Sequence, residues 1–169
     1  MKHFPFAGKA LALLFSSALL VACSGSDTKE QEEAEAAAAA AAAAEAAASA
    51  AAAEQQARED AATAAGTVFY FEFDSSTLTA DSINQLNLHI AALQGNDRNI
   101  RLEGHTDERG TREYNLALGE RRANAVRDFM VANGIATYRI EAVSYGEERP
   151  AAYGSGEANW AQNRRVELK

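Results

Sequence analysis

An alanine tract from Ala36 to Ala53, interrupted only by Glu45 and Ser49, limits what this chain can fold into. Alanine has the best helix propensity but almost no side chain to bury, so the tract cannot build a hydrophobic core. We therefore expect a spacer here, as a solvated helix or a fluctuating one. An alanine coiled coil is the alternative, although no Leu, Ile or Val occurs between positions 24 and 67.

The residues before the tract have the pattern of an export signal. A basic start is followed by an apolar run from Ala10 to Ala22, which is too short for a membrane-spanning helix of about 20 residues. The sequence Leu-Val-Ala-Cys that ends at Cys23 resembles the lipobox of bacterial lipoproteins. This resemblance implies an S-diacylglycerol and an N-acyl chain on Cys23, which suffice to hold a protein on a bilayer. The resemblance further implies that Ser24, in place of an aspartate after the cysteine, favours sorting to the outer membrane, with the folded domain in the periplasm. The alternative is a free thiol after an ordinary signal.

These features divide the chain into a signal peptide (1–22), a lipidated N-terminus with an alanine-rich linker (23–66) and a folded domain (67–169).

A net charge of −8 argues against nucleic acid as a partner, because phosphate binding needs clustered excess Lys and Arg. A single cysteine excludes internal disulfides and thiolate metal clusters. Eleven of the twelve cations in residues 67–169 are arginines, the side chain best suited to bidentate binding of carboxylates.

The folded part alternates between strand and helix patterns. Strands are expected at 67–73, 99–105, 139–145 and 164–168, and helices between Thr79 and Gly95, over 112–133 and, for one turn, near Asn159. This order predicts an α+β fold with helices on one face of a sheet. Both faces of 67–73 are largely apolar, which favours a central strand for that segment.

Two polar residues fall on the apolar face of the second long helix. At 100° per residue, Arg122 lies roughly 40° and Asn115 about 60° from Leu118, within the apolar arc. A buried guanidinium must be paired, because an unpaired buried charge is too costly to keep. One alternative is an internal salt bridge, for which the candidate acids are Asp74, Glu103 and Asp107. The other is a polar pocket in which Arg122 and a loop carboxylate bind a zwitterionic ligand, with parallel neighbouring strands bringing the loops together.

The segment from Gly104 to Val126, GHTDERGTREYNLALGERRANAV, resembles the signature of OmpA-like peptidoglycan-binding domains. FEFDSS, SYG and NRRVEL extend the likeness to nearly all of the folded part. The resemblance implies a βαβαβ(α)β sandwich with a four-stranded mixed sheet. It also implies a site for the diaminopimelate of the peptidoglycan stem peptide, in which Asp107 holds the amino end and Arg122 the carboxylate. The other pocket residues that it implies are Phe73, Asp74, Asn115 and Leu118.

Together with the lipobox, the resemblance to lipoproteins of this family implies a function. The expected protein binds peptidoglycan non-covalently and ties the outer membrane to the cell wall. It would act within the Tol system in envelope integrity and cell division, with TolB, and TolA as a further candidate, as protein partners. The alternative is a domain that mainly docks Tol components, with wall binding secondary.

An enzyme is not expected. The sequence has no nucleophile elbow, phosphate-binding loop or paired-histidine zinc motif. A muropeptide hydrolase that uses Asp74 and Asp107 as its two carboxylates is a remote alternative, and Arg122 would lower rather than raise their pKa values. Neither a cofactor nor a metal is expected. His105 is expected to pack in the fold rather than bind a metal, and His89 to be exposed.

Overall fold

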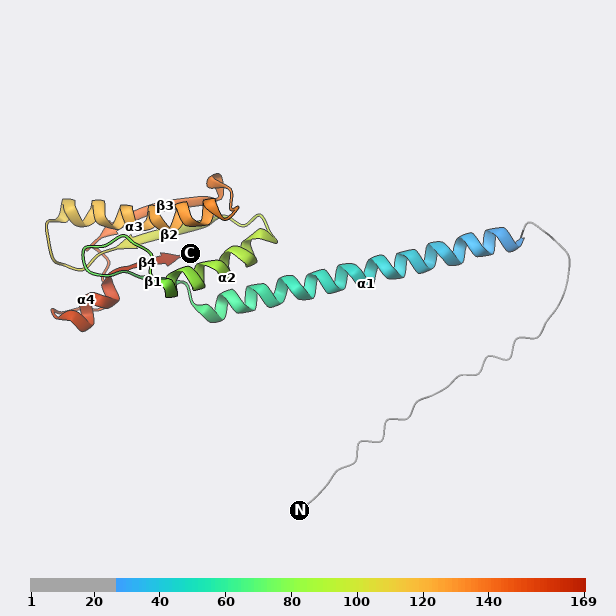
Figure 1. Ribbon diagram of the computed structural model, residues 1–169, viewed down its shortest axis with the longest axis horizontal. Helices are drawn as coiled ribbons and strands as arrows, with labels where there is room; N and C mark the ends of the chain where they lie inside the picture. Colours follow the sequence, from blue (N-terminus) through green and yellow to red (C-terminus); the bar gives the residue numbers. More distant parts are fainter. Residues whose placement is uncertain (1–26) are drawn as a thin grey trace, which may run out of the picture. The chain divides into compact units, whose positions relative to one another are not determined.

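Four helices and four strands make up residues 27–169, the part of the chain that this computed structural model describes (Figure 1). In chain order they are α1 (Asp27–Ala65), β1 (Val68–Tyr70), α2 (Ala80–Gln94), β2 (Ile100–His105), α3 (Arg112–Ala132), a 3-10 turn (Thr137–Arg139), β3 (Ile140–Gly146), α4 (Glu157–Asn163) and β4 (Arg165–Leu168). The predicted signal peptide and the predicted lipidation site, Cys23, lie outside the described residues.

The four strands form one mixed sheet in the order β1-β4-β2-β3. Strands β2 and β3 are parallel, whereas β4 runs antiparallel to both of its neighbours, β1 and β2. The last strand in sequence therefore lies between β1 and β2, so the prediction that the two loop-bearing strands are neighbours is wrong. They are parallel to each other across β4, and the loops that follow them still emerge at the same end of the sheet.

The prediction of a central first strand is also wrong, because β1 is a short edge strand. Only Val68 to Tyr70 pair with β4, although the backbone N–H of Phe71 still bonds to the carbonyl of Arg164 at 3.0 Å. Phe69 and Phe71 point into the core, whereas Tyr70 and Phe73 remain about half exposed. Phe69 and Phe71 therefore pack in the core on one side of the strand, whereas Tyr70 lies exposed on the other.

Helices α2 and α3 pack on one face of the sheet, which confirms the predicted fold class. One hydrophobic cluster joins the two helices to all four strands; its members include Phe69, Leu86, Ile90, Leu102, Val126, Met130, Ile140 and Val166. Both helices start at the expected kind of residue: Thr79 accepts a hydrogen bond from the N–H of Ser82, and Thr111 caps α3 in the same way.

Glycines let α3 approach the sheet closely. A Cβ on Gly104 of β2 would lie 2.0 Å from the carbonyl oxygen of Gly119 in α3. A Cβ on Gly119 would in turn lie 2.4 Å from the hydroxyl of Ser144. The two backbones therefore touch here, and this contact fixes the first half of α3 against the ends of β2 and β3.

The alanine tract is helical and belongs to α1, a continuous helix of 39 residues. By length and composition alone this helix could cross a membrane. Its last turns, however, make polar contacts with the domain and form one compact unit with it from Ala46 onwards. Gln55 donates to the carbonyl of Ala92 at 2.8 Å, and Gln85 donates to the carbonyl of Ala65 at 2.7 Å.

The segment after α1 also corrects one expectation about the histidines. His89 is buried rather than exposed, and its Nε2 lies 2.7 Å from the carbonyl oxygen of Gly66. Its ring meets Phe69 edge to face, with the ring centroids 6.0 Å apart. His89 therefore joins α2 to the turn between α1 and β1.

Candidate functional site

A cavity of about 200 Å³ lies where the loops after β1 and β2 meet the first turns of α3. It brings together all six residues for which the sequence predicted a role in binding, and four more. The lining consists of Phe73, Asp74, Thr106, Asp107, Arg109, Gly110, Tyr114, Asn115, Leu118 and Arg122. A larger and more open groove between α2 and α4 contains none of the six. We therefore take the smaller cavity, which we call the α3 pocket, as the candidate site.

Arg122 is fully buried beneath the α3 pocket and is bonded to backbone rather than to a carboxylate. Its Nε donates to the carbonyl of Ser75 at 2.8 Å, its Nη1 to that of His105 at 3.0 Å, and its Nη2 to that of Glu72 at 3.1 Å. Among residues 27–169 no acid forms an ion pair with it, so the salt-bridge alternative is wrong. A guanidinium has five N–H donors, so two remain without a partner among the described residues.

The charge of Arg122 is therefore not neutralised by a direct anionic contact within the described chain. Burial lowers the pKa of Arg122 to about 10, although the negative charge of Asp107 acts in the opposite direction. The side chain thus stays protonated at neutral pH. An anion that enters the pocket would meet a desolvated cation with free donors, which is a strong electrostatic interaction.

Asp107 also lines the pocket, and its carboxylate is saturated with donors. Its carboxylate accepts the backbone N–H and Nε of Arg109, both at 3.1 Å, and Nη2 of the same residue at 2.7 Å. Arg164 adds a fourth, longer bond of 3.5 Å. Burial raises the pKa of Asp107, but the hydrogen bonds and charge of Arg109, together with Arg164, outweigh burial and hold the pKa below its usual value.

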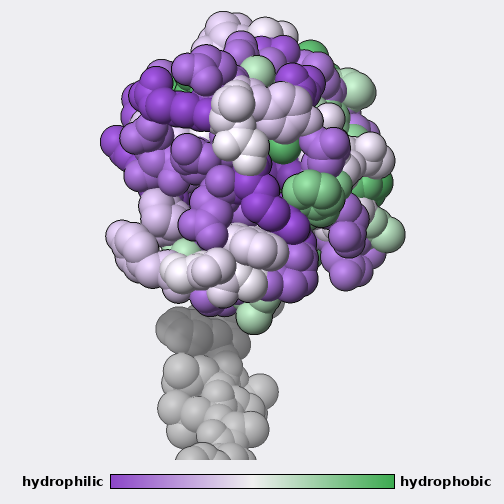
Figure 2. Space-filling model, turned by 90° about the vertical axis from the view of Figure 1, so that its left-hand side faces the viewer, coloured by the Kyte–Doolittle hydropathy of each residue, from purple (hydrophilic) through white to green (hydrophobic). Residues whose placement is uncertain are grey.

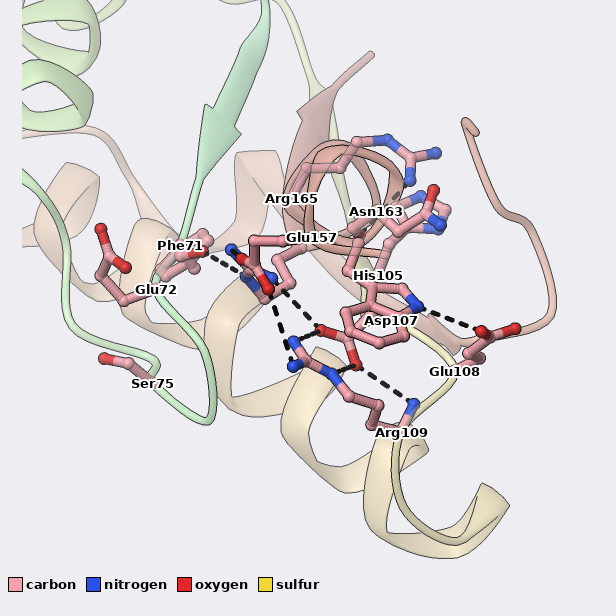
Figure 3. Close-up of polar contacts among 12 residues, drawn as sticks. Phe71, Glu72, Ser75, His105, Asp107, Glu108, Arg109, Glu157, Asn163 and Arg165 are labelled. Atoms are coloured by element: carbon pink, nitrogen blue, oxygen red, sulfur yellow. Dashed lines mark hydrogen bonds and ion pairs between the residues drawn. The ribbon is translucent and has the colours of Figure 1, made fainter. Parts of the chain in front are cut away.

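Arg109 is the main site residue that the sequence analysis did not single out. Its guanidinium lies 4.0 Å from the ring centroid of Phe73 and 4.2 Å from that of Trp160. Figure 3 shows it reaching back to Asp107, with Glu157 of α4 close by. The only signal in the sequence was its place two positions after Asp107, and nothing there indicated that α4 would supply a second aromatic wall.

The rim of the pocket is formed by exposed aromatic and acidic side chains. Asp74 has a φ of 54°, in the left-handed region that a non-glycine residue seldom adopts, and its carboxylate accepts a hydrogen bond from the Tyr114 hydroxyl. The same bond raises the pKa of Tyr114. Asn115 is buried and donates to Glu147 at 2.6 Å, whereas Leu118 provides an apolar wall.

The arrangement suits recognition of a small zwitterion. Arg122 offers positive charge and free donors, and Asp107 and Asp74 offer negative charge a short way along the same cavity. Around it, the face that carries α4 and the start of α3 is largely hydrophilic, with hydrophobic side chains isolated among polar ones (Figure 2). A polar ligand therefore fits this face better than a broad apolar partner.

Known proteins are similar to this chain in both sequence and fold. The model of the OmpA family matches residues 70–164, more than half of the chain. The peptidoglycan-associated lipoprotein of Pseudomonas aeruginosa is 56% identical over 108 residues, and that of Brucella melitensis 48% identical over 102. The matched part covers 64% of this chain and 64% of the Pseudomonas protein, and 60% and 61% respectively for the Brucella protein.

Solved structures agree with the sequence comparison. The crystal structure of the peptidoglycan-associated lipoprotein from Burkholderia pseudomallei superposes with a TM-score of 0.60 at 47% identity, over 62% of this chain and 89% of that one. The cell wall anchor of the T6SS from Pseudomonas aeruginosa gives a TM-score of 0.51 at 27% identity, over 59% of this chain and 72% of that one. Because the family model matches more than half of the chain, including every residue that lines the α3 pocket, the chain belongs to the OmpA family.

Proposed function

We propose that this protein is an outer-membrane lipoprotein that binds peptidoglycan non-covalently through the diaminopimelate of the stem peptide. The relatives in Pseudomonas and Brucella are named peptidoglycan-associated lipoproteins, and a structural neighbour is a cell wall anchor. These names support a wall-binding role for the shared domain.

Arg122 carries the proposal. It is fully buried and lines a cavity of about 200 Å³; within residues 27–169 it forms no ion pair, and two of its five N–H donors have no partner there. A ligand carboxylate would complete this site, and an adjoining ammonium would meet Asp107 or Asp74. Within a stem peptide, the free end of diaminopimelate carries both groups on one carbon, so it matches the two signs of charge.

The lowered pKa and the hydrogen bonds of Asp107 argue against a hydrolase. A glycoside hydrolase needs one carboxylic acid with a raised pKa, whereas the pKa of Asp107 is lowered and its carboxylate accepts four hydrogen bonds. Such a group is a poor proton donor. Asp107 therefore does not suit the role of general acid in such a hydrolase.

The proposal also includes a lipid anchor in the membrane and protein partners. Lipid on Cys23 would hold the chain in the outer membrane, and the part of α1 that precedes Ala46 would act as the tether. We further propose that the protein works in the Tol–Pal system in envelope integrity and cell division, with TolB, and TolA as a further candidate, binding the same domain. This part rests on the family resemblance and on the lipobox.

The test is co-sedimentation of the full chain with purified peptidoglycan, with Asp107→Asn and Arg122→Lys as pocket variants. Asp128→Asn and Arg127→Lys are matched controls, because they make the same chemical changes on a part of α3 outside the pocket. The two control side chains pair with each other there. We expect the controls to bind and the pocket variants, if folded by circular dichroism, to lose binding.

Competition separates the proposed ligand from a general charge effect. Free diaminopimelate should displace the protein from peptidoglycan, whereas 1,5-diaminopentane, which keeps both amino groups but lacks both carboxylates, should not. Binding by folded pocket variants, or equal displacement by 1,5-diaminopentane, would place the site elsewhere. Release of soluble muropeptides would establish a hydrolase instead. Folded pocket variants that no longer bind TolB but still bind peptidoglycan would favour a domain that mainly docks Tol components.

A further inference from the structure

The carboxylate of Asp107 has no room for a ligand in this structure. An ionised carboxylate offers about four acceptor sites. Asp107 accepts four hydrogen bonds, three from Arg109 and one from Arg164, and its side chain is 5% exposed. A ligand ammonium therefore reaches Asp107 only if one of the two arginines leaves.

Arg164 is the arginine that stays. It is buried, and besides Asp107 it donates to the carbonyl of Phe71 at 3.0 Å and to Glu157 at 2.7 Å. These bonds tie the start of β4 to the segment after β1 and to α4. Displacement of Arg164 would break contacts between three parts of the domain.

Arg109 is the arginine that is free to leave. Its side chain is 29% exposed and extends from a loop, and its other charged and aromatic neighbours within residues 27–169 are the rings of Phe73 and Trp160 and, at 3.7 Å, Glu157. Two aromatic faces and a carboxylate form the kind of site that binds ammonium groups in proteins. The guanidinium thus occupies a cation site that the protein itself fills, and Figure 3 shows its two carboxylates, Asp107 and Glu157.

We propose that Arg109 is an internal stand-in for the ligand's ammonium, which the ligand displaces from Asp107 when it binds. This inference rests on the proposed function. The exchange replaces one cation on Asp107 by another, so the buried carboxylate never stands without its partner. It also lowers the affinity, because the bonds of Arg109 are broken as those of the ligand form, and it favours ligands that carry a cation beside their carboxylate.

The direct test is calorimetric titration of the full chain in detergent with diaminopimelate, comparing wild type with Arg109→Gln. We expect the variant to bind about tenfold more tightly, because a charge-assisted contact no longer has to be broken. Arg112→Gln is the matched control; Arg112 lies three positions away and pairs with the exposed Glu148, so its loss should leave the affinity unchanged. If the Gln variant does not fold, Arg109→Lys, which keeps charge but loses the bidentate bonds, should still bind more tightly than wild type.

Trp160 provides a second readout, because it is the sole tryptophan of the chain and stacks on Arg109. Diaminopimelate should change its fluorescence in wild type, and Arg109→Gln should show the changed emission before ligand is added. Weaker binding by Arg109→Gln would make Arg109 a ligand contact, and equal binding would mean that it is not displaced; either result overturns the proposal. Absence of binding in both proteins would instead overturn the proposed function.

Discussion

Arg122 donates a hydrogen bond from Nη1 to the carbonyl oxygen of His105 at 3.0 Å and so fastens the middle of α3 to the end of β2. The same guanidinium holds two carbonyls in the segment after β1. One buried side chain thus joins the two loops that line the α3 pocket. It has a structural role as well as its proposed role in binding, and the two are separable by experiment.

The structural role predicts a large loss of stability in Arg122→Ala. Three carbonyl groups would lose a charged donor, and we expect the free energy of unfolding to fall by about 3 kcal/mol or more, measured by urea denaturation. Arg121→Ala, the exposed neighbour, should stay within about 0.5 kcal/mol of wild type. Equal effects of the two changes would show that the three backbone contacts contribute little.

The burial of Arg122 could be predicted from sequence, but its partners could not. Helical periodicity placed this residue on the apolar face of α3, and that prediction is confirmed. The expected partner was a carboxylate, because a sequence displays acidic side chains and not the course of a loop. The segment after β1 turns at Asp74 through a left-handed conformation, and this turn brings the carbonyls of Glu72 and Ser75 to the guanidinium.

The helices and inner strands were more predictable than the sheet edge. Thr79 marked the start of α2, because a side-chain cap is a local signal. The edge position of β1 depends on which strand inserts between β1 and β2, a long-range choice that local patterns do not contain. The stacking of Arg109 on Trp160 has the same origin, because α4 and the loop after β2 are far apart in sequence.

His105 predicts a specific dependence of stability on pH. Its ring is buried against Tyr145, with no hydrogen-bond partner for either nitrogen among the described residues. Burial, followed by the charge of Arg165, lowers its pKa from 6.5 to about 4, although Glu167 opposes the shift. Between these two values the unfolded chain takes up a proton that the folded chain does not, so stability should fall as the pH drops from about 6.5 to 4.

The size of this effect is about 3 kcal/mol at most, since one pKa unit corresponds to about 1.4 kcal/mol. His105→Phe removes the titrating group and keeps an aromatic ring beside Tyr145. Urea denaturation at several pH values should therefore give a flatter stability profile for the variant over this range. Parallel profiles for the two proteins would mean that other groups cause the loss.

The close contact between β2 and α3 predicts that only glycine fits at position 104. In Gly104→Ala the new methyl group would meet the backbone carbonyl of Gly119, which has no room to move, and we expect a destabilisation of about 3 kcal/mol by thermal or urea unfolding. Gly95→Ala is the control, because its φ of −84° suits alanine and the methyl group meets only the end of the Gln55 side chain. A smaller loss of about 1 kcal/mol is expected there, because the displaced Gln55 gives up its bond to Ala92.

The end of α1 predicts that the stable unit starts before Thr67, the boundary expected from sequence. Gln55 bonds to Ala92 of α2, whereas its neighbour Gln56 bonds only to Asp60 within α1. Gln55→Ala should therefore lower the free energy of unfolding by about 1 kcal/mol, and Gln56→Ala should have little effect. Residues 46–169 should also unfold at higher urea concentration than residues 67–169. Identical midpoints for the two fragments would favour the boundary at Thr67.

The central claim, that the α3 pocket binds diaminopimelate, is tested most directly by a crystal structure of the chain with this ligand. The account predicts a ligand carboxylate within hydrogen-bond distance of Arg122 and the adjoining ammonium at Asp107, with Arg109 turned away. Diaminopimelate bound outside the pocket, or bound in it without contact to Arg122, would contradict the account.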